Sequence, residues 1–231
     1  KSAYHQVVLG ESSRHLTAFV TPDGLFQYRR MPFGLASAAA VFQRIIEEIL
    51  QGLEGISIYQ DDVLVYGRNV EEHNDRLHNV LSAMQSRGVR LRKDKCEFAV
   101  DTLEYLGHKV SKDGIAPRTG LLSAITEVAI PTDKDKLRAF MGMCEYYSKF
   151  IQGFAMLAEP LFSILKKNTR FEWKESQQQA FDEIKQGLTN APLLSPYMPG
   201  AEMMITVDAS NVGIGAVLTQ NQKGQEKTIA F

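Results

Sequence analysis

The feature that most constrains this fold is the stretch Ile56–Tyr66, in which β-favouring residues run into and out of Gln60-Asp61-Asp62. Such residues favour extended, half-buried backbone, so the stretch predicts a β-hairpin with two carboxylates at its tip. Adjacent anions repel each other unless solvent screens them or a divalent cation bridges them. The tip is therefore either an ordinary Asp-containing turn or part of a metal site, and the flanking sequence has to decide.

The length, hydrophobic content and net charge are those of an ordinary globular protein. It has 231 residues, of which 44% are hydrophobic, and a formal net charge of -1. This length allows about one to two domains with normal cores. Because the net charge is near zero, a nucleic acid partner must be bound by local patches. No apolar run reaches about eighteen residues, so we expect no membrane partner.

The cysteines predict the cellular compartment, and the first residue bears on whether the sequence is a segment of a longer protein. Cys96 and Cys144 are far apart and lack a zinc-type pairing with the histidines. We expect both to be packed thiols in a reducing, intracellular compartment. The chain opens on Lys1 rather than Met, and we expect it to be a segment of a longer protein.

The first half of the chain predicts alternating strands and helices. Ser37 is a good helix N-cap, and Asn69 with Glu72 forms a capping-box pattern. The expected elements are a strand over 3–9, a hairpin of strands 17–20 and 25–29 around Thr21-Pro22-Asp23-Gly24, a helix over 37–50, a helix of about eighteen residues after Asn69, and strands over 89–91 and 103–110. This order favours an α+β fold in which one sheet carries helices on one face.

From Pro117 the pattern becomes helical, and after Pro196 it returns to strands. Ser176 with Gln179 forms a further capping-box pattern. The expected elements are helices over 132–143, 146–151, 155–167 and 176–188, then strands over 203–207, 213–218 and 228–231. We therefore predict a domain boundary near residue 115 and a second one near residue 195.

Several short motifs, taken in order, resemble one known family. They look like the polymerase region of gypsy-type LTR retrotransposon polyproteins, a reverse transcriptase followed by the start of a ribonuclease H domain. The motifs are Lys-Ser-Ala-Tyr-His-Gln at 1–6, Met-Pro-Phe-Gly-Leu at 31–35, Val-Phe-Gln at 41–43, Tyr-Gln-Asp-Asp at 59–62, Lys-Cys-Glu-Phe at 95–98, Tyr-Leu-Gly-His at 105–108, Tyr-Tyr-Ser-Lys-Phe-Ile at 146–151 and Val-Asp-Ala-Ser at 207–210. Each motif is short, and the ordered set carries the resemblance.

The resemblance implies a fold and its division. It implies a palm-type reverse transcriptase sheet with helices, followed by a helical thumb and the first strands of a ribonuclease H-like domain. The expected domains are partial fingers and palm over 1–115, a helical thumb or connection over 116–195, and a truncated start of the ribonuclease H-like domain over 196–231.

The resemblance also implies a catalytic site. Asp61 and Asp62 match the paired aspartates that hold two Mg²⁺ ions, with Mn²⁺ as the alternative metal. The third aspartate of the family falls two positions before Lys1. Asp208 matches the first carboxylate of the ribonuclease H metal site, whose other ligands fall after Phe231. We expect no cleavage activity from this stretch.

The same resemblance gives expectations for substrate and primer contacts, and some of these residues have a purely structural alternative. Tyr4 resembles the aromatic gate under the incoming sugar, or it is a core tyrosine. Phe33, Gly34 and Gln43 fall in the nucleotide and template pocket, where packing and helix-start roles are the alternative. Tyr59 and Gln60 flank the primer terminus. Leu106 and Gly107 resemble the primer-grip turn, where a small residue permits close backbone approach.

Cationic residues have two readings as well. Lys95 matches a lysine proposed to protonate the leaving pyrophosphate, which requires hydrogen-bond reach of the departing oxygen. The run that contains it is otherwise a solvated face: Arg87, Arg90, Arg92, Lys93 and Lys95. In the helical region a further set of residues is expected to contact the duplex phosphates, as a thumb does: Tyr146, Tyr147, Lys149, Lys166 and Lys167. For the two tyrosines, the alternative is that they pack in the core of the bundle.

The leading hypothesis is an RNA-directed DNA polymerase segment that adds dNTPs to a primer on an RNA or DNA template. Its expected partners are the primer–template, dNTPs and the rest of a polyprotein, with a protease upstream and the ribonuclease H remainder and integrase downstream. The expected location is a cytoplasmic virus-like particle or the nucleus. The alternatives are an inactive or co-opted relic that binds nucleic acid or protein, and a purely structural subunit.

Overall fold

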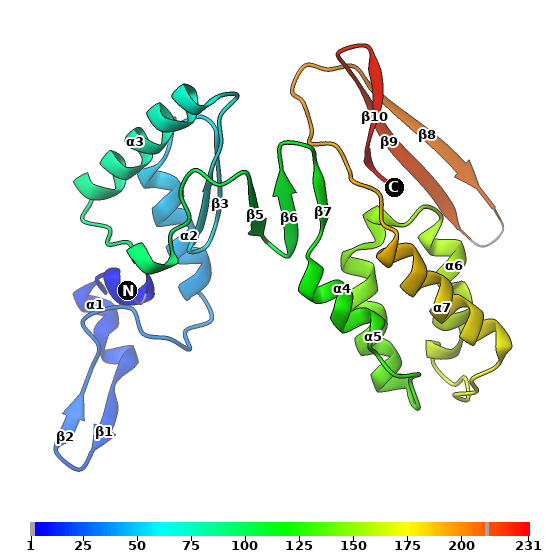
Figure 1. The fold of residues 1–231 in the computed structure, drawn as a ribbon. Helices are drawn as coiled ribbons and strands as arrows, with labels where there is room; N and C mark the ends of the chain where they lie inside the picture. Colours follow the sequence, from blue (N-terminus) through cyan, green and yellow to red (C-terminus); the bar gives the residue numbers. More distant parts are fainter. Residues whose placement is uncertain (1–2, 211–212) are drawn as a thin grey trace. The chain divides into compact units, whose positions relative to one another are not determined.

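The structure is a computed structural model that describes residues 3–210 and 213–231. The chain divides into two compact units, one ending at Phe98 and the other running from Ala99 to Phe231. Helices and small antiparallel sheets occur in both, which confirms the α+β class (Figure 1). Within the described residues, no helix is both long enough and apolar enough to cross a bilayer. The three-domain division stays a prediction.

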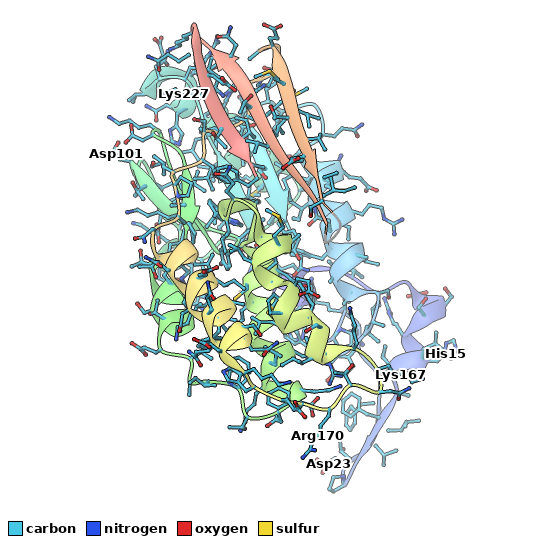
Figure 2. The ribbon with its side chains drawn as sticks, turned by 90° about the vertical axis from the view of Figure 1, so that its right-hand side faces the viewer. His15, Asp23, Asp101, Lys167, Arg170 and Lys227 are labelled. Atoms are coloured by element: carbon cyan, nitrogen blue, oxygen red, sulfur yellow. The ribbon has the colours of Figure 1, made fainter. Side chains whose placement is uncertain are left out.

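The first unit contains two hairpins and two long helices. Its hairpins are β1–β2 and β3–β4, and its main helices are α2 and α3. The elements are η1 (Ala3–Gln6), α1 (Glu11–Arg14), η2 (His15–Thr17), β1 (Phe19–Thr21), β2 (Gly24–Phe26), α2 (Ala38–Ile49), β3 (Ile56–Tyr59), β4 (Asp62–Val65), α3 (Val70–Ser86) and η3 (Lys93–Lys95). The β1–β2 hairpin carries Asp23 at its tip (Figure 2).

The core of the first unit forms between α2 and α3. Phe42 and Ile46 on α2 and Val80 and Met84 on α3 are each at most 5% exposed. Burying a side chain of this size contributes about 1.5–3 kcal/mol. The buried residues of each helix recur at a spacing of four, which places them on one face of that helix.

The second unit contains a helical bundle and two three-stranded sheets, β5-β6-β7 and β10-β9-β8. Helices α4 to α7 lie together in Figure 1, and α6 also contacts β9. The elements are β5 (Thr102–Tyr105), β6 (His108–Ser111), β7 (Ile115–Pro117), α4 (Thr119–Thr126), α5 (Lys134–Tyr146), η4 (Ser148–Phe150), α6 (Phe154–Leu165), α7 (Glu175–Thr189), β8 (Met203–Ala209), β9 (Ile214–Gln222) and β10 (Gln225–Ala230).

The bundle has a well-packed aromatic and aliphatic core. Phe140, Leu161, Phe181 and Ile184 are each at most 2% exposed, and the rings of Phe140 and Phe181 lie 4.6 Å apart between centroids. Lys167 and Arg170 lie in the connection between α6 and α7, outside this core (Figure 2). The predicted helices 132–143, 155–167 and 176–188 are confirmed, while 146–151 is largely a 3₁₀ turn.

Of the three predicted helix caps, Asn69 is confirmed, Ser37 lies at the N-cap position of α2 without a side-chain hydrogen bond, and the box at Ser176 is wrong. Asn69 caps α3, because its side chain accepts the backbone N–H of Glu72 at 2.9 Å. The predicted box of Ser176 and Gln179 is wrong. Helix α7 begins at Glu175, and the backbone N–H of Lys174 donates to the Gln177 side chain at 3.1 Å.

Two predicted strands are wrong over most of their length, although Val8 at the end of the first forms an isolated bridge with Arg30. The start of the predicted strand 3–9 is a 3₁₀ turn in which the N–H of Val7 donates to Tyr4 O at 3.0 Å. Residues 89–91 form no strand, because both backbone groups of Arg90 bond the side-chain amide of Gln6, at 2.7 and 3.2 Å. The backbone groups needed for a ladder are thus already bonded locally or to a side chain.

The predicted strand 103–110 is in fact a hairpin. β5 and β6 pair antiparallel through Tyr105 and His108, and Leu106 and Gly107 form the turn. The expectation of a single sheet is wrong as well, since the strands of the described residues form separate two- and three-stranded sheets. Each hairpin supplies its own ladder partner, so no common sheet is required.

Candidate functional site

The two adjacent aspartates lie at a tight hairpin, as predicted. β3 and β4 pair from Ile56 opposite Val65 to Tyr59 opposite Asp62, which leaves Gln60 and Asp61 as the turn. Gln60 has a positive φ of 54°, a left-handed conformation that non-glycine residues adopt infrequently. Both carboxylates are exposed to solvent. The turn therefore presents two neighbouring anionic oxygen ligands outward.

The side chain of Gln43 on α2 holds this turn. Its Oε1 accepts the backbone N–H of Gln60, and its Nε2 donates to Ile58 O at 3.2 Å and to Glu47 Oε1 at 2.7 Å. The Gln43 amide thus donates to one backbone group of the hairpin and accepts from another. These hydrogen bonds offset the energetic cost of the positive φ of Gln60. In this structure, Gln43 is a support of the hairpin, whereas a pocket contact remains a prediction.

The base of the hairpin is fixed by Arg76 on α3. Its Nη1 donates to Tyr66 O at 2.9 Å, and its Nη2 lies 2.9 Å from Glu72 Oε1. The guanidinium also packs on Gly55, where an added Cβ would approach Arg76 atoms to 2.4 Å. A hydrogen bond from Arg68, with smaller contributions that include the Arg76 charge, lowers the pKa of Glu72. Arg76 therefore connects the segments that flank β3 and β4 to helix α3.

An aromatic group lies close to the start of the described chain. The ring centroids of Tyr4 and Phe33 are 5.4 Å apart, and those of Tyr4 and Phe42 are 5.8 Å apart. Tyr4 is half-buried against the first-unit core, whereas Phe33 is 63% exposed. Gly34 follows with φ of 89°. The structure thus brings Tyr4 and Phe33 together, and only Phe33 offers a large free surface.

Lys95 lies apart from these contacts. It closes the 3₁₀ turn η3 and is exposed, and its neighbours Arg92 and Asp94 form an ion pair. In the part of the chain that the structure describes, no ion pair joins Lys95 to Asp61 or Asp62. Its role as a proton donor remains a prediction.

The remaining predicted residues belong to the second unit. Leu106 and Gly107 form the β5–β6 turn with φ values of 46° and 71°. Asp208 is exposed on β8 opposite Gly215. Among the described residues, no group of three or more His, Cys, Asp or Glu is arranged to hold a metal ion. Of the predicted metal ligands, Asp61 and Asp62 are the two that lie side by side, at the hairpin tip.

Sequence reasoning missed two positioning residues, Arg76 and Gln6. An arginine on an amphipathic helix normally belongs to a solvated face, so Arg76 carried no signal. Gln6 belongs to the motif at 1–6, but its partner Arg90 is 84 residues away. Neither contact follows from local spacing.

Comparisons with known proteins agree with this arrangement. Residues 1–110 match the family described as reverse transcriptase (RNA-dependent DNA polymerase), and residues 173–231 match the RNase H-like domain found in reverse transcriptase. The Pol polyproteins of the Drosophila melanogaster transposons 297 and 412 are 38% and 35% identical over 94% and 100% of this chain. The Schizosaccharomyces pombe transposon Tf2-3 polyprotein is 33% identical over 95% of it.

Solved structures agree on the fold. The foamy viral protease-reverse transcriptase covers the whole chain at 20% identity, with TM-scores of 0.88 and 0.87 for two complexes with double-stranded DNA and 0.84 for the complex with an RNA/DNA hybrid. The present chain spans 21%, 19% and 17% of the three transposon polyproteins. It belongs to the reverse transcriptases of retrotransposon Pol polyproteins and includes the start of their RNase H-like domain.

Proposed function

We propose that this chain supplies the catalytic hairpin of an RNA-directed DNA polymerase that extends a primer with dNTPs. The observation that supports this proposal most directly is the exposed Asp61-Asp62 pair. It lies on a turn whose backbone is hydrogen-bonded by the side chain of Gln43. Two exposed carboxylates suit Mg²⁺, which binds one or two carboxylates together with substrate phosphates. The family match and the relatives that are Pol polyproteins support the same reading.

In the proposed reaction the primer 3′-hydroxyl loses its proton to solvent, its oxygen bonds the α-phosphorus of a dNTP, and the bond from that phosphorus to pyrophosphate breaks. Bound Mg²⁺ supplies charge stabilisation and makes the primer hydroxyl more acidic. Asp61 and Asp62 would hold the metal. Gln43 and Gln60 keep the turn in one conformation, so its carboxylates need little reorganisation when substrate binds.

Other residues have proposed supporting roles. Phe33, exposed beside Tyr4, offers an aromatic surface to the incoming nucleotide. Tyr59 is 52% exposed next to the turn, where it can contact the primer end. Lys95 is proposed to give the proton to the departing pyrophosphate. The duplex partner is suggested by the foamy viral structures, whose titles name double-stranded DNA and an RNA/DNA hybrid.

The test is primer extension by the chain together with whatever polyprotein sequence flanks it in its gene. We expect extension to need Mg²⁺ or Mn²⁺ and to be abolished by Asp61→Asn and by Asp62→Asn. Asp75→Asn, at an exposed position of α3, is the matched control and retains activity. Extension by either turn variant would contradict the metal role. Primer–template binding without extension by the unmodified protein would support the inactive relic instead.

A further inference from the structure

The turn between β5 and β6 is held in a conformation that its backbone does not favour. Leu106 and Gly107 both have positive φ, at 46° and 71°. Gly107 adopts this region without penalty, but Leu106 pays about 1–2 kcal/mol for it. Contacts from the surrounding structure must therefore stabilise the turn.

Two adjacent tyrosine hydroxyls supply these contacts. Tyr146 Oη donates to Leu106 O at 2.7 Å, and Tyr147 Oη donates to Gly107 O at 2.7 Å. Tyr146 is the last residue of α5, and Tyr147 leaves the helix with φ of -107° and ψ of 9°. This departure lets neighbouring side chains reach the same turn, which consecutive helical positions would not allow.

Two further donors complete the binding of the turn carbonyls. The ring of His108 lies with Nδ1 2.7 Å from Leu106 O, and the backbone N–H of Arg118 donates to Gly107 O at 3.2 Å. A carbonyl only accepts hydrogen bonds, so Nδ1 carries the proton. Both carbonyls thus have two donors, one of them a tyrosine from the end of α5.

The two tyrosine side chains also explain why a residue without a Cβ stands at position 107. A Cβ built on Gly107 would lie 2.8 Å from Tyr147 Oη and 3.4 Å from Tyr146 Cε1. Tyr147 is 3% exposed, whereas Tyr146 is 53% exposed. The small residue therefore permits close approach of tyrosine side chains, where a close backbone approach had been expected.

We infer that Tyr146 and Tyr147 are positioning residues that lock the β5–β6 turn to the end of α5, so that this turn presents one fixed backbone surface to the primer strand. The inference rests on the proposed polymerase function and on the resemblance of this turn to a primer grip. It assigns the hydroxyls to the turn rather than to duplex phosphates.

The test compares Tyr146→Phe, Tyr147→Phe and the double variant with the unmodified protein, in the same flanked polyprotein. Phenylalanine keeps each ring and removes only the hydroxyl. Tyr197→Phe, at an exposed tyrosine of the same unit, is the control. Three quantities are measured: amide hydrogen exchange over residues 102–111, the Kd for a primer–template, and the length of the extension products.

We expect exchange over 102–111 to rise about threefold to tenfold for each hydroxyl lost, as for one neutral hydrogen bond. The primer–template Kd should rise by a similar factor, with shorter products, while exchange in α6 and α7 stays unchanged. Unchanged exchange over 102–111 would overturn the lock. Faster exchange with an unchanged Kd would overturn the positioning role.

A protein whose unmodified form binds no primer–template would overturn the proposed function and the positioning role together. The exchange data would still decide whether the hydroxyls hold the turn. The two failures are therefore distinguishable.

Discussion

Gln43 on α2 and Gln60 at the β3–β4 turn are joined by a hydrogen bond from the Gln60 backbone N–H to the Gln43 side chain. The same amide donates to Ile58 O, so it grips both the turn and the strand that leads into it. The conformation of the residue before Asp61 is thus set by a helix side chain 17 residues earlier in the chain.

Gln43→Ala should destabilise the first unit and loosen the aspartate turn. The substitution leaves the partly buried N–H of Gln60 without its partner, which costs about 1–3 kcal/mol. Urea denaturation measures the loss. Arg44→Ala, at the next and exposed position of the same helix, is the control and should change stability by less than about 0.5 kcal/mol. Equal losses for the two variants would contradict the role of Gln43.

Gly55 and Arg76 should be energetically coupled. Gly55 has φ of 68°, and a Cβ there would meet the Arg76 guanidinium. Gly55→Ala should therefore cost more in the wild-type background than in Arg76→Ala, where the collision is gone. A double-mutant cycle by thermal or urea denaturation should give a coupling of about 0.5–3 kcal/mol. Additive losses would show that backbone strain alone accounts for the glycine.

The second unit should lose stability as the pH falls. Burial, and then the charge of Lys149, lower the pKa of His108 below its ordinary value of 6.5. The unfolded chain therefore binds a proton at a higher pH than the folded chain, and stability is lost as the pH falls through about 6.5 toward the lower folded pKa.

His108→Phe separates this effect from general acid sensitivity. The ring of His108 lies 5.5–5.8 Å from the rings of Tyr146, Tyr147 and Phe150, so an aromatic replacement keeps the packing. The urea midpoint of the wild type should fall between pH 7.5 and 5.5 by more than that of the variant. His15→Phe, in the first unit, should leave the pH dependence of the second unit unchanged. Identical pH profiles for wild type and His108→Phe would contradict the assignment.

The two thiols should differ sharply in reactivity. Cys144 is fully buried on α5, and burial raises the pKa of its thiol to about 12. Because the thiolate is the reactive form, Cys144 should resist a thiol reagent at pH 8 until the protein unfolds. Cys96 is only partly buried and should react in the folded state. Labelling followed by peptide mass spectrometry checks this, and Cys96→Ser should leave almost no label on the folded protein.

Local signals predicted the elements whose hydrogen bonds close within a few residues. The turn at Pro22-Asp23-Gly24, the Asn69 cap and the Asp61-Asp62 hairpin all form as expected, since turn chemistry, capping and strand alternation act over short distances. Local signals failed where the partner is distant. Arg90 bonds Gln6 instead of a strand. The short helix α4 (Thr119–Thr126) was not expected, because no side chain caps its start.

The sequence by itself determined the family and the pair of aspartates, because ordered motifs and a hairpin pattern are properties of the chain alone. Only the tertiary structure decided what holds these features in place. Gln43 supports the aspartate turn, Arg76 hydrogen-bonds the backbone at the base of that hairpin, and Tyr146 and Tyr147 bind the β5–β6 turn. Such contacts join residues separated by 10 to 40 positions, and their geometry is fixed only when the helices have packed.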